Sequence, residues 1–317
     1  MYKPLLHTSS FGPIGWLAAL LLLFGCEATP MLPEEEATVH PSGVTLLLAA
    51  ASSEETDSDA NLPEEYAILN LSIFMADAGS ETFSDKFVYQ SFTAVPGSGF
   101  KGCQQVRLPL DPATVGHKDI YVIANYDNVA GLSAINTLSD LKALRTPRVA
   151  AGNKISIERG LPMYGESLDV DLSGSATQPV QVDLIRTCAK IEFTLSFPDP
   201  SWVGTNSRFT VLEAQSYTYF VPNSDVVPLT DLVQYPQIIL TPQPEDPSVF
   251  KGIVYIYESK YHLSFISIQT VIGGKSREYV IDKSVPLPVR NQMYSVLVEI
   301  LHPLTGPDAL TKLTATF

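Results

Sequence analysis

The sequence predicts an all-β fold with two β-sandwich domains and one short helix in the N-terminal domain. Short apolar stretches separated by Gly, Pro, Asn and Asp recur from Tyr66 onward, and this spacing is typical of β-sandwiches. Hydrophobic residues make up 45% of the 317 residues and charged residues 17%, which is enough to build a buried core. About 290 residues remain after removal of an N-terminal signal, a length that favours two domains over one.

The strand signals fall into two groups on either side of residues 172–180, a polar stretch that we interpret as a linker or long turn. The first domain is expected to cover 43–178 and the second 179–317. Strands are expected in the first domain at 67–75, 87–92, 104–110 and 119–125. Strands are expected in the second domain at 182–197, 208–219, 252–257, 261–272, 277–281 and 292–300, with a hairpin turn at Gly273 and Gly274.

One helix is expected in the first domain, beginning after Thr137. Thr137 and Asp140 have the spacing of a capping box, with Asp in place of the usual Glu. Pro147 is expected to end the helix, because proline cannot continue the backbone hydrogen-bond pattern. The apolar residues that share one face of this helix are Leu138, Leu141 and Leu144.

The N-terminus reads as a secretory signal peptide, residues 1–25. Lys3 is the only Lys or Arg before an apolar run at 16–25, and Gly25 precedes Cys26. The ending Leu-Phe-Gly-Cys at 23–26 resembles the lipobox of bacterial lipoproteins, in which the cysteine becomes the first mature residue and carries the lipid. The alternative is a membrane-spanning anchor, but the run is shorter than the roughly 20 apolar residues that a span needs.

The net charge of −14 is concentrated near the N-terminus. Residues 27–85 contain 13 acidic residues and no Lys or Arg, whereas residues 86–317 contain 19 basic and 21 acidic residues. Nucleic acid and acidic membrane surfaces are therefore not expected as partners, because both require a basic patch. Residues 26–42 contain three prolines and a Glu run, and we interpret them as an acidic tether.

An apolar island at 43–51 lies between two polar, acidic segments. Such an apolar strand has to be buried in a core, yet its polar connections would allow it to dissociate from that core. The other two cysteines, Cys103 and Cys188, could form a disulfide in an exported protein or stay as isolated buried thiols, and the sequence leaves both open.

No motif of catalysis or cofactor binding emerges. The G-x-G-x-x-G match at 97–102 precedes a predicted strand rather than the helix that nucleotide binding requires. The histidines are scattered, outside the spacings of zinc sites. Asp169 and Asp171 alternate on one strand, but we give little weight to a glycosidase carboxylate pair. We therefore predict no catalytic, cofactor-binding or metal-ligating residues, and no enzyme.

Four segments in order carry a family resemblance. The segments are Ile-Tyr-Val-Ile-Ala-Asn at 120–125, Leu-Pro-Met-Tyr-Gly at 161–165, Leu-Ile-Arg-Thr-Cys-Ala-Lys-Ile-Glu-Phe at 184–193 and Pro-Val-Arg-Asn-Gln-Met-Tyr-Ser-Val-Leu-Val at 288–298. They resemble the V-x-A-N, P-M-x-G, R-x-x-A-K and R-N-x-x-Y-x-V strand motifs of FimA-like fimbrillins, the pilins of Bacteroidales type V pili. A leucine-rich helix after the first segment and the lipobox fit the same family.

The resemblance implies two transthyretin-like β-sandwich domains and a structural, adhesive role in a fimbrium. In that family the precursor travels to the outer membrane as a lipoprotein. A protease then cuts after an arginine in the loop following the first strand. The apolar groove left by that strand accepts the C-terminal strand of the next pilin subunit.

In this chain the resemblance assigns lipidation to Cys26, the removable first strand to 43–51 and a donor strand to 309–317. The alternating residues expected to face the groove are Thr311, Leu313, Ala315 and Phe317. An ordinary strand of its own domain is an equal alternative for this segment.

The loop 52–65 departs from the family because it contains no Arg or Lys. Three possibilities follow: a protease of other specificity, an anchor subunit that keeps its first strand and lipid, or an accessory subunit. We expect no arginine-directed mature N-terminus between residues 53 and 66. The rival interpretation of the whole chain is a monomeric surface lipoprotein that binds a glycan or protein ligand.

Overall fold

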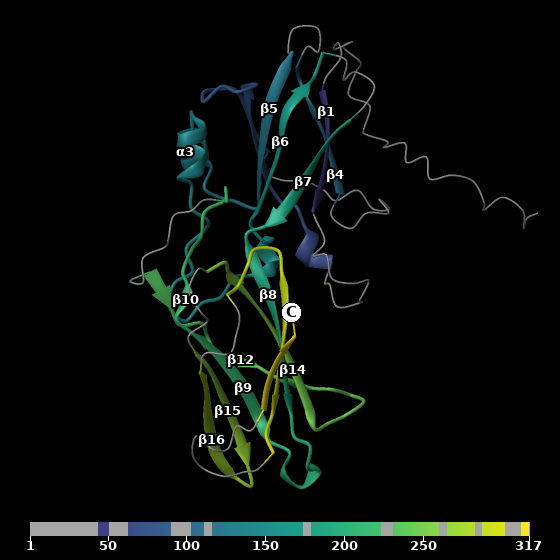
Figure 1. Ribbon diagram of the computed structural model, residues 1–317, viewed down its shortest axis with the longest axis vertical. Helices are drawn as coiled ribbons and strands as arrows, with labels where there is room; N and C mark the ends of the chain where they lie inside the picture. Colours follow the sequence, from purple (N-terminus) through teal and green to yellow (C-terminus); the bar gives the residue numbers. More distant parts are fainter. Residues whose placement is uncertain are drawn as a thin grey trace, which may run out of the picture. The chain divides into compact units, whose positions relative to one another are not determined.

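The structure is a computed structural model of the 317-residue chain (Figure 1). Residues 39–317 form one compact unit. The structure describes residues 44–50, 63–89, 103–110, 116–173, 179–222, 231–259, 265–282, 287–301 and 312–316.

The N-terminal part of the compact unit is built on seven strands in the order β3-β2-β5-β6-β7-β1-β4. The strands are β1 (Val44–Ala50), β2 (Leu71–Asp77), β3 (Phe83–Tyr89), β4 (Cys103–Leu108), β5 (His117–Ala124), β6 (Met163–Asp171) and β7 (Val180–Arg186). Only two residue pairs join β6 to β7, Met163 with Arg186 and Tyr164 with Ile185. The sheet therefore divides into two layers at this point, β3-β2-β5-β6 and β7-β1-β4.

One hydrophobic core lies between these two layers. Leu46 and Leu48 of β1, Ile73 of β2 and Val122 of β5 belong to the same buried cluster. Figure 1 shows β1 and β4 on one side of β5 and β6. This arrangement is the β-sandwich that the spacing of short strands and turn residues predicted.

Two short helices cover the other face of β2 and β5: α2 (Val129–Ser133) and α3 (Leu138–Lys142). Leu132 and Leu141 pack with Phe74 and Tyr121 in a second buried cluster. The capping box at α3 is confirmed, because the Thr137 side chain accepts from the Asp140 backbone and the Asp140 side chain accepts from the Thr137 backbone.

The prediction of one helix is wrong in number. The missed helix, α2, has only five residues and begins just after its N-cap Asn128, whose side chain accepts a hydrogen bond from the Gly131 N–H. Five residues give too short a periodic pattern for recognition in a sequence. Helix α3 ends at Lys142, before the predicted stop at Pro147.

The C-terminal part contains a five-stranded sheet, β13-β14-β8-β17-β18, a four-stranded sheet, β12-β9-β15-β16, and the small pair β10-β11. Their strands are β8 (Cys188–Ser196), β9 (Thr205–Leu212), β10 (Ala214–Gln215), β11 (Leu232–Val233), β12 (Ile238–Ile239), β13 (Thr241–Pro242), β14 (Val249–Tyr257), β15 (Phe265–Ile272), β16 (Lys275–Asp282), β17 (Met293–Glu299) and β18 (Lys312–Thr316). Phe193 of β8 stacks on Phe209 of β9 with ring centroids 4.7 Å apart, which joins the two larger sheets through the core.

The hairpin of β15 and β16 turns where the sequence predicted. Gly273 and Gly274 both have positive φ, 57° and 75°, as a two-residue hairpin turn requires.

The single strand predicted at 182–197 is wrong, because the chain breaks at Thr187 into β7 and β8. The Thr187 N–H leaves the ladder and donates to the Pro162 carbonyl, 2.9 Å away, as the chain crosses between sheets. The linker predicted at 172–180 is also too long, since Leu172 is buried and Val180 begins β7. The division into two domains stays a prediction.

Candidate functional site

Strand β1 lies between two strands that come much later in the chain. It pairs antiparallel with β4 from Val44–Leu108 to Ala49–Cys103, and parallel with β7 from Leu46–Val180 to Ala50–Leu184. The removable strand predicted at 43–51 is thus a strand at the centre of its layer. Among the described residues, β4 has no strand partner other than β1.

The side chains of β1 alternate between the core and the outside. Val44, Leu46 and Leu48 are fully buried and Ala50 is nearly so, whereas the residues between them are half-buried. Burial of each large apolar side chain stabilises a fold by about 1.5–3 kcal/mol. The three large residues together contribute about 5–9 kcal/mol, which is comparable with the net stability of a whole domain.

Loss of β1 would therefore do more than expose one edge. Strand β4 would lose its partner, and β7 would keep only its two residue pairs with β6. The backbone N–H and C=O groups of both strands would face an empty position lined by core side chains. An exposed position of this kind strongly favours pairing with another strand.

Among the described strands, β18, at the other end of the chain, has a neighbour on one side only. It forms the edge of the five-stranded sheet and pairs antiparallel with β17 from Ser295–Thr316 to Glu299–Lys312. Of the predicted donor residues, Leu313 lies opposite Val298 and Ala315 opposite Val296, while Thr311 and Phe317 lie outside the described residues. In this structure the C-terminal segment is a strand of its own sheet.

A buried charge cluster stands just after the connection that follows β1. Glu65 is fully buried in a 3₁₀ turn, η1 (Pro63–Tyr66). Its carboxylate accepts from Arg186 Nη1 at 2.8 Å and from the Tyr255 hydroxyl at 2.8 Å, and it pairs with Lys190 Nζ at 2.9 Å. Two cations and a hydroxyl compensate the buried carboxylate, as such a burial requires.

The cluster connects the end of β7 with the C-terminal sheet. Arg186 ends β7 two residues after Leu184, the partner of Ala50, while Lys190 lies in β8 and Tyr255 in β14. Burial and the neighbouring Glu65 carboxylate raise the pKa of Tyr255 well above its usual value, so its hydroxyl stays protonated and donates. The chain after β1 is thereby fastened to β7, β8 and β14 independently of β1.

Sequence reasoning missed Glu65, which it placed in a loop ending at residue 65. The available signal was the motif at 184–193, whose Arg186 and Lys190 are both buried and require an anionic partner. Nothing distinguished Glu65 from the other acidic residues between 27 and 85.

The other motif residues also hold backbone in place. The Asn125 side chain accepts from the Leu69 N–H and donates to the Ala67 and Leu161 carbonyls at 2.7–2.8 Å. Gly165 approaches β7 so closely that a Cβ atom there would lie 2.4 Å from the Asp183 carbonyl oxygen. These motifs are explained by structure rather than by chemistry on a substrate.

Arg290 plays a similar role near the C-terminus. It donates to the Glu258 carboxylate, with Nε at 2.8 Å, and to the Phe220 and Tyr219 carbonyls at 2.8 and 3.1 Å. Its neighbour Asn291 accepts from Arg186 Nε at 2.8 Å, which links the two motifs.

The remaining predicted site residues are only partly described. Cys26 lies outside the described residues, and of Cys103 only the backbone position, opposite Ala49 in β4, is described. Cys188 is a free, buried thiol at the start of β8, and burial raises its pKa to about 12. The disulfide between Cys103 and Cys188 stays a prediction.

Within the described ranges, no three His, Cys, Asp or Glu side chains gather as a metal site would require. No helix in the same ranges is long and apolar enough to span a membrane. Asp169 pairs with His117 at 2.9 Å, and Asp171 caps Ser173, so the two acids considered for glycoside hydrolysis have separate local partners.

Comparison with known proteins places this geometry in a family. Residues 43–194 match the family model of the major fimbrial subunit protein, FimA. A search of curated proteins found no match. One similar solved structure is a candidate cell adhesion protein from Bacteroides eggerthii, with 15% identity, a TM-score of 0.57 and coverage of 89% of this chain and 97% of that one. Another, also a candidate cell adhesion protein, from Bacteroides ovatus, has 10% identity, a TM-score of 0.50 and coverage of 87% of this chain and 96% of that one.

The two structural likenesses show that the fold is shared over nearly the whole compact unit. The matched family region begins at β1 and ends within β8, so it contains the β1 position, Glu65 and both of its cationic partners. The family is one of structural fimbrial subunits rather than enzymes. Over residues 43–194, this chain is therefore similar to the FimA-like fimbrillin family.

Proposed function

We propose that this fimbrillin is exported as a lipoprotein on Cys26 and joins other subunits of a fimbrium by donor-strand exchange. In the exchange, the C-terminal strand of one copy takes the β1 position of the next. The central place of β1 between β4 and β7 is the observation that supports this most strongly.

The pairing of the two strands makes the exchange favourable. A strand in the β1 position has six residue pairs with β4 and five with β7, whereas β18 has five pairs with β17 alone. Each backbone hydrogen bond contributes about 0.5–1.5 kcal/mol net. A C-terminal strand therefore gains partners when it moves from the sheet edge into a vacated β1 position.

The orientation of the incoming strand follows from its two neighbours. It must run parallel to β7 and antiparallel to β4, as β1 does. Side chains at alternate positions then replace Val44, Leu46, Leu48 and Ala50 in the core. The predicted donor residues 311, 313, 315 and 317 have the required spacing of two.

Strand β1 does not dissociate spontaneously, because the free energy gained by burying its side chains is comparable with the net stability of a domain. Cleavage between Ala50 and Pro63 would separate it from the Glu65 cluster, which keeps the following chain fastened. This stretch contains no Lys or Arg. That absence favours either a protease of other specificity or a subunit that keeps β1 and its lipid and ends the fibre as an anchor at the outer membrane surface.

Gel analysis of the cell-surface fraction tests the proposal. Polymerised subunits are expected as detergent-resistant ladders that disappear when residues 306–317 are deleted. Monomers that are unaffected by this deletion would contradict strand exchange and favour the rival, a monomeric lipoprotein that binds a ligand.

Intact mass of the same fraction tests export and processing. A mature chain starting at a lipid-modified Cys26 is expected for an anchor, and one starting between residues 51 and 63 for a shaft subunit. A new N-terminus immediately after an arginine would contradict the processing that we propose, and an unmodified Cys26 at the surface would contradict lipidation.

A further inference from the structure

Two neighbouring cavities open along the loop between α3 and β6. The first has a volume of about 670 Å³ and is lined mainly by residues of this loop, with Asn125, Asp127, Pro236 and Tyr257 around it. The second, about 660 Å³, lies along β12 and the start of β14. Both are in the size range of ligand sites. They share Lys154 and Pro236, so they adjoin each other, and we treat them together as one groove.

Three cations are spaced along this groove. Arg159 lines the first cavity, Lys154 lines both and Lys251 lines the second. All three are exposed, and among the described residues none has a carboxylate within ion-pair distance. We call this surface the basic groove.

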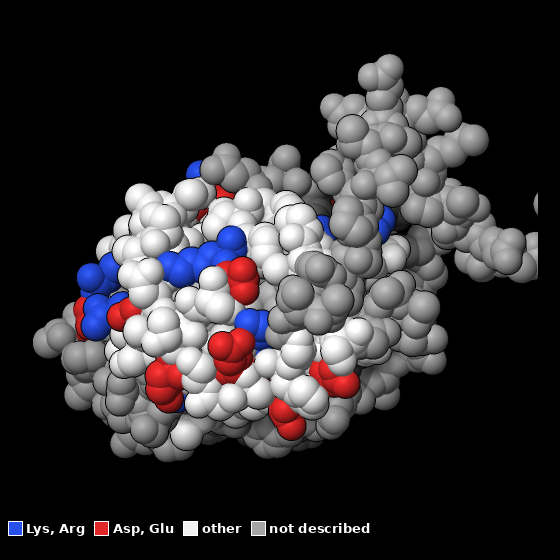
Figure 2. Space-filling model, turned by 90° about the horizontal axis from the view of Figure 1, so that it is seen from above, with Lys and Arg blue, Asp and Glu red and all other residues white. Residues whose placement is uncertain are grey.

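Together the two cavities are lined by four Lys or Arg residues and two acidic residues, a local excess of positive charge in a chain whose net charge is −14. On the face seen in Figure 2, basic and acidic side chains lie side by side. Arg148, which also lines the first cavity, pairs with Asp231. The cations of the basic groove instead leave positive charge available for an anionic ligand.

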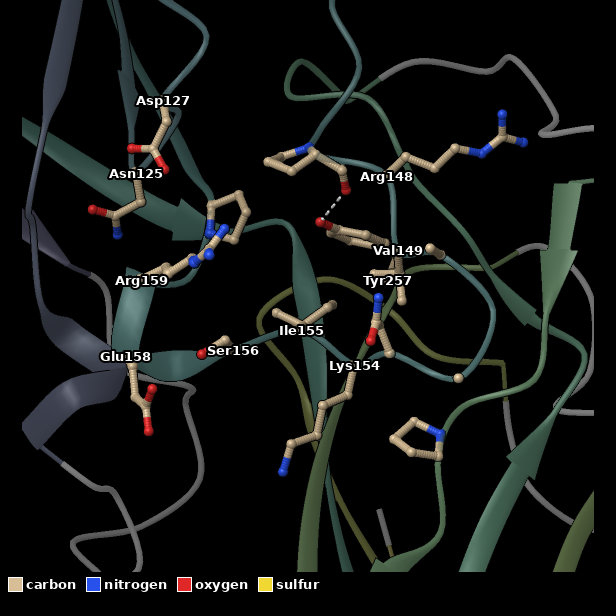
Figure 3. A pocket seen from close by; sticks show the side chains of 17 residues that line it. Asn125, Asp127, Arg148, Val149, Lys154, Ile155, Ser156, Glu158, Arg159 and Tyr257 are labelled. Atoms are coloured by element: carbon tan, nitrogen blue, oxygen red, sulfur yellow. Dashed lines mark hydrogen bonds between the residues drawn. The ribbon is translucent and has the colours of Figure 1, made fainter.

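The first cavity also offers groups that bind hydroxyls. Figure 3 shows Asn125, Asp127 and Arg159 on one side and Val149 and Tyr257 on the other, with the Arg148 side chain directed away. Asp127 has one carboxylate oxygen bonded to Asn70. The carboxylates of Asp127 and Glu158 can accept hydrogen bonds from neutral hydroxyls.

This mixed lining selects between two anionic ligands. Asp127 and Glu158 repel a continuously acidic peptide, whereas they suit a chain that carries many hydroxyls and a carboxylate or sulfate at intervals. In the second cavity, Ile239 is 71% exposed and Ile253 is half-buried, which provides apolar contact for the C–H faces of sugar rings. We propose that the basic groove binds a linear anionic polysaccharide, independently of strand exchange.

Binding to the purified chain by biolayer interferometry tests this proposal. The probes are polygalacturonate, for carboxylates, chondroitin sulfate, which also carries sulfates at intervals, and dextran as a neutral polymer. Binding of either anionic probe is expected, with an affinity that falls as NaCl is raised from 50 to about 500 mM, since charge contacts are screened. Equal binding of dextran, or no binding of any probe, would overturn the proposal.

The triple variant K154Q/R159Q/K251Q locates the site. It is expected to weaken binding about tenfold or more, because it removes all three exposed charge contacts of the groove. The matched control is R107Q/K142Q/K275Q, which removes the same charge at three exposed positions outside the groove and should change affinity less than about twofold.

Equal weakening in the two triple variants would overturn the proposal, because net charge rather than the groove would then determine binding. Competition by poly-glutamate as effective as that by polygalacturonate would also overturn it, since an acidic peptide would then suffice. Thermal unfolding of both variants, expected to match the parent chain, confirms that exposed substitutions leave the fold intact.

Discussion

Strands β1 and β18 differ in how much of the surrounding sheet and core depends on each of them. β1 lies between β4 and β7, fills the core with Val44, Leu46 and Leu48, and is the only described strand partner of β4. β18 borders one strand, β17, at the edge of its sheet. Strand β1 is therefore a central part of its layer, whereas β18 is an edge strand, which we propose the fold can release.

In the strand exchange that we propose, this difference would set the direction. An empty β1 position has two incomplete neighbours and an open core, so it accepts a strand strongly. A vacated β17 edge remains one side of a sheet that still contains β8, β14 and β13. Four predictions test the comparison, from the largest expected effect to the smallest.

A charge on the inward face of β1 should have the largest effect. The substitution L46D places a carboxylate at a fully buried position and should lower the free energy of unfolding by about 4 kcal/mol or more, because a buried charge without a partner is costly. Urea unfolding measures the change.

The matched control is L47D, whose side chain is half-buried on the outward face of the same strand. It should cost about 1 kcal/mol or less. Equal losses for L46D and L47D would show that β1 is not held by its inward side chains.

The Glu65 cluster should give the next effect. E65Q leaves Arg186 and Lys190 without their buried carboxylate and should cost about 3–5 kcal/mol, as expected when one member of a buried ion pair is removed. The exposed neighbour provides the control E64Q, which should cost less than about 0.5 kcal/mol. A small cost for E65Q would mean that the chain after β1 is fastened elsewhere.

Deletion of residues 306–317 should affect stability much less than L46D or E65Q. It removes five residue pairs at one edge together with the entropy cost of ordering the deleted residues, so the free energy of unfolding should fall by less than about 2 kcal/mol. Differential scanning calorimetry provides the measurement. Global unfolding of this variant would contradict the view of β18 as a strand that can be released.

The last prediction concerns the reactivity of Cys188 and involves no change in stability. Burial raises the pKa of its thiol to about 12, so the folded chain keeps it neutral at pH 8 and up to pH values near 12, whereas the unfolded thiol ionises near 9. Alkylation by iodoacetamide at pH 8, mapped by peptide mass, should be at least 100-fold slower than in urea.

Because Cys188 lies in β8, opening of the β1 position alone should leave it protected. Rapid labelling after deletion of residues 1–52 would show that loss of β1 unfolds the C-terminal sheet as well.

The sequence was sufficient to predict the fold class and β1, for a physical reason. Alternating apolar residues and turn residues are local signals, and an apolar island between acidic segments has to be buried. The central position of β1 could not be predicted, because it depends on parallel pairing with β7, more than 130 residues later.

The Glu65 cluster could not be predicted from the sequence for the same reason. Its partners Arg186 and Tyr255 are 121 and 190 residues away, and only the folded chain brings them together. The break at Thr187 was missed because the apolar alternation continues from β7 into β8, although the chain changes sheets there.

Competition between two disulfides tests strand exchange most directly. Thr314 in β18 lies opposite Leu297 of its own β17, and Gln105 in β4 lies opposite Leu47 of β1. Two variants share the substitutions C103S and T314C. One also carries L297C, which reports pairing within the same chain, and the other carries Q105C, which reports pairing with another copy. In the variant without residues 1–52, T314C is expected to bond Q105C of another copy and give a ladder on a non-reducing gel. An intramolecular bond to L297C alone, with no ladder from Q105C, would contradict strand exchange.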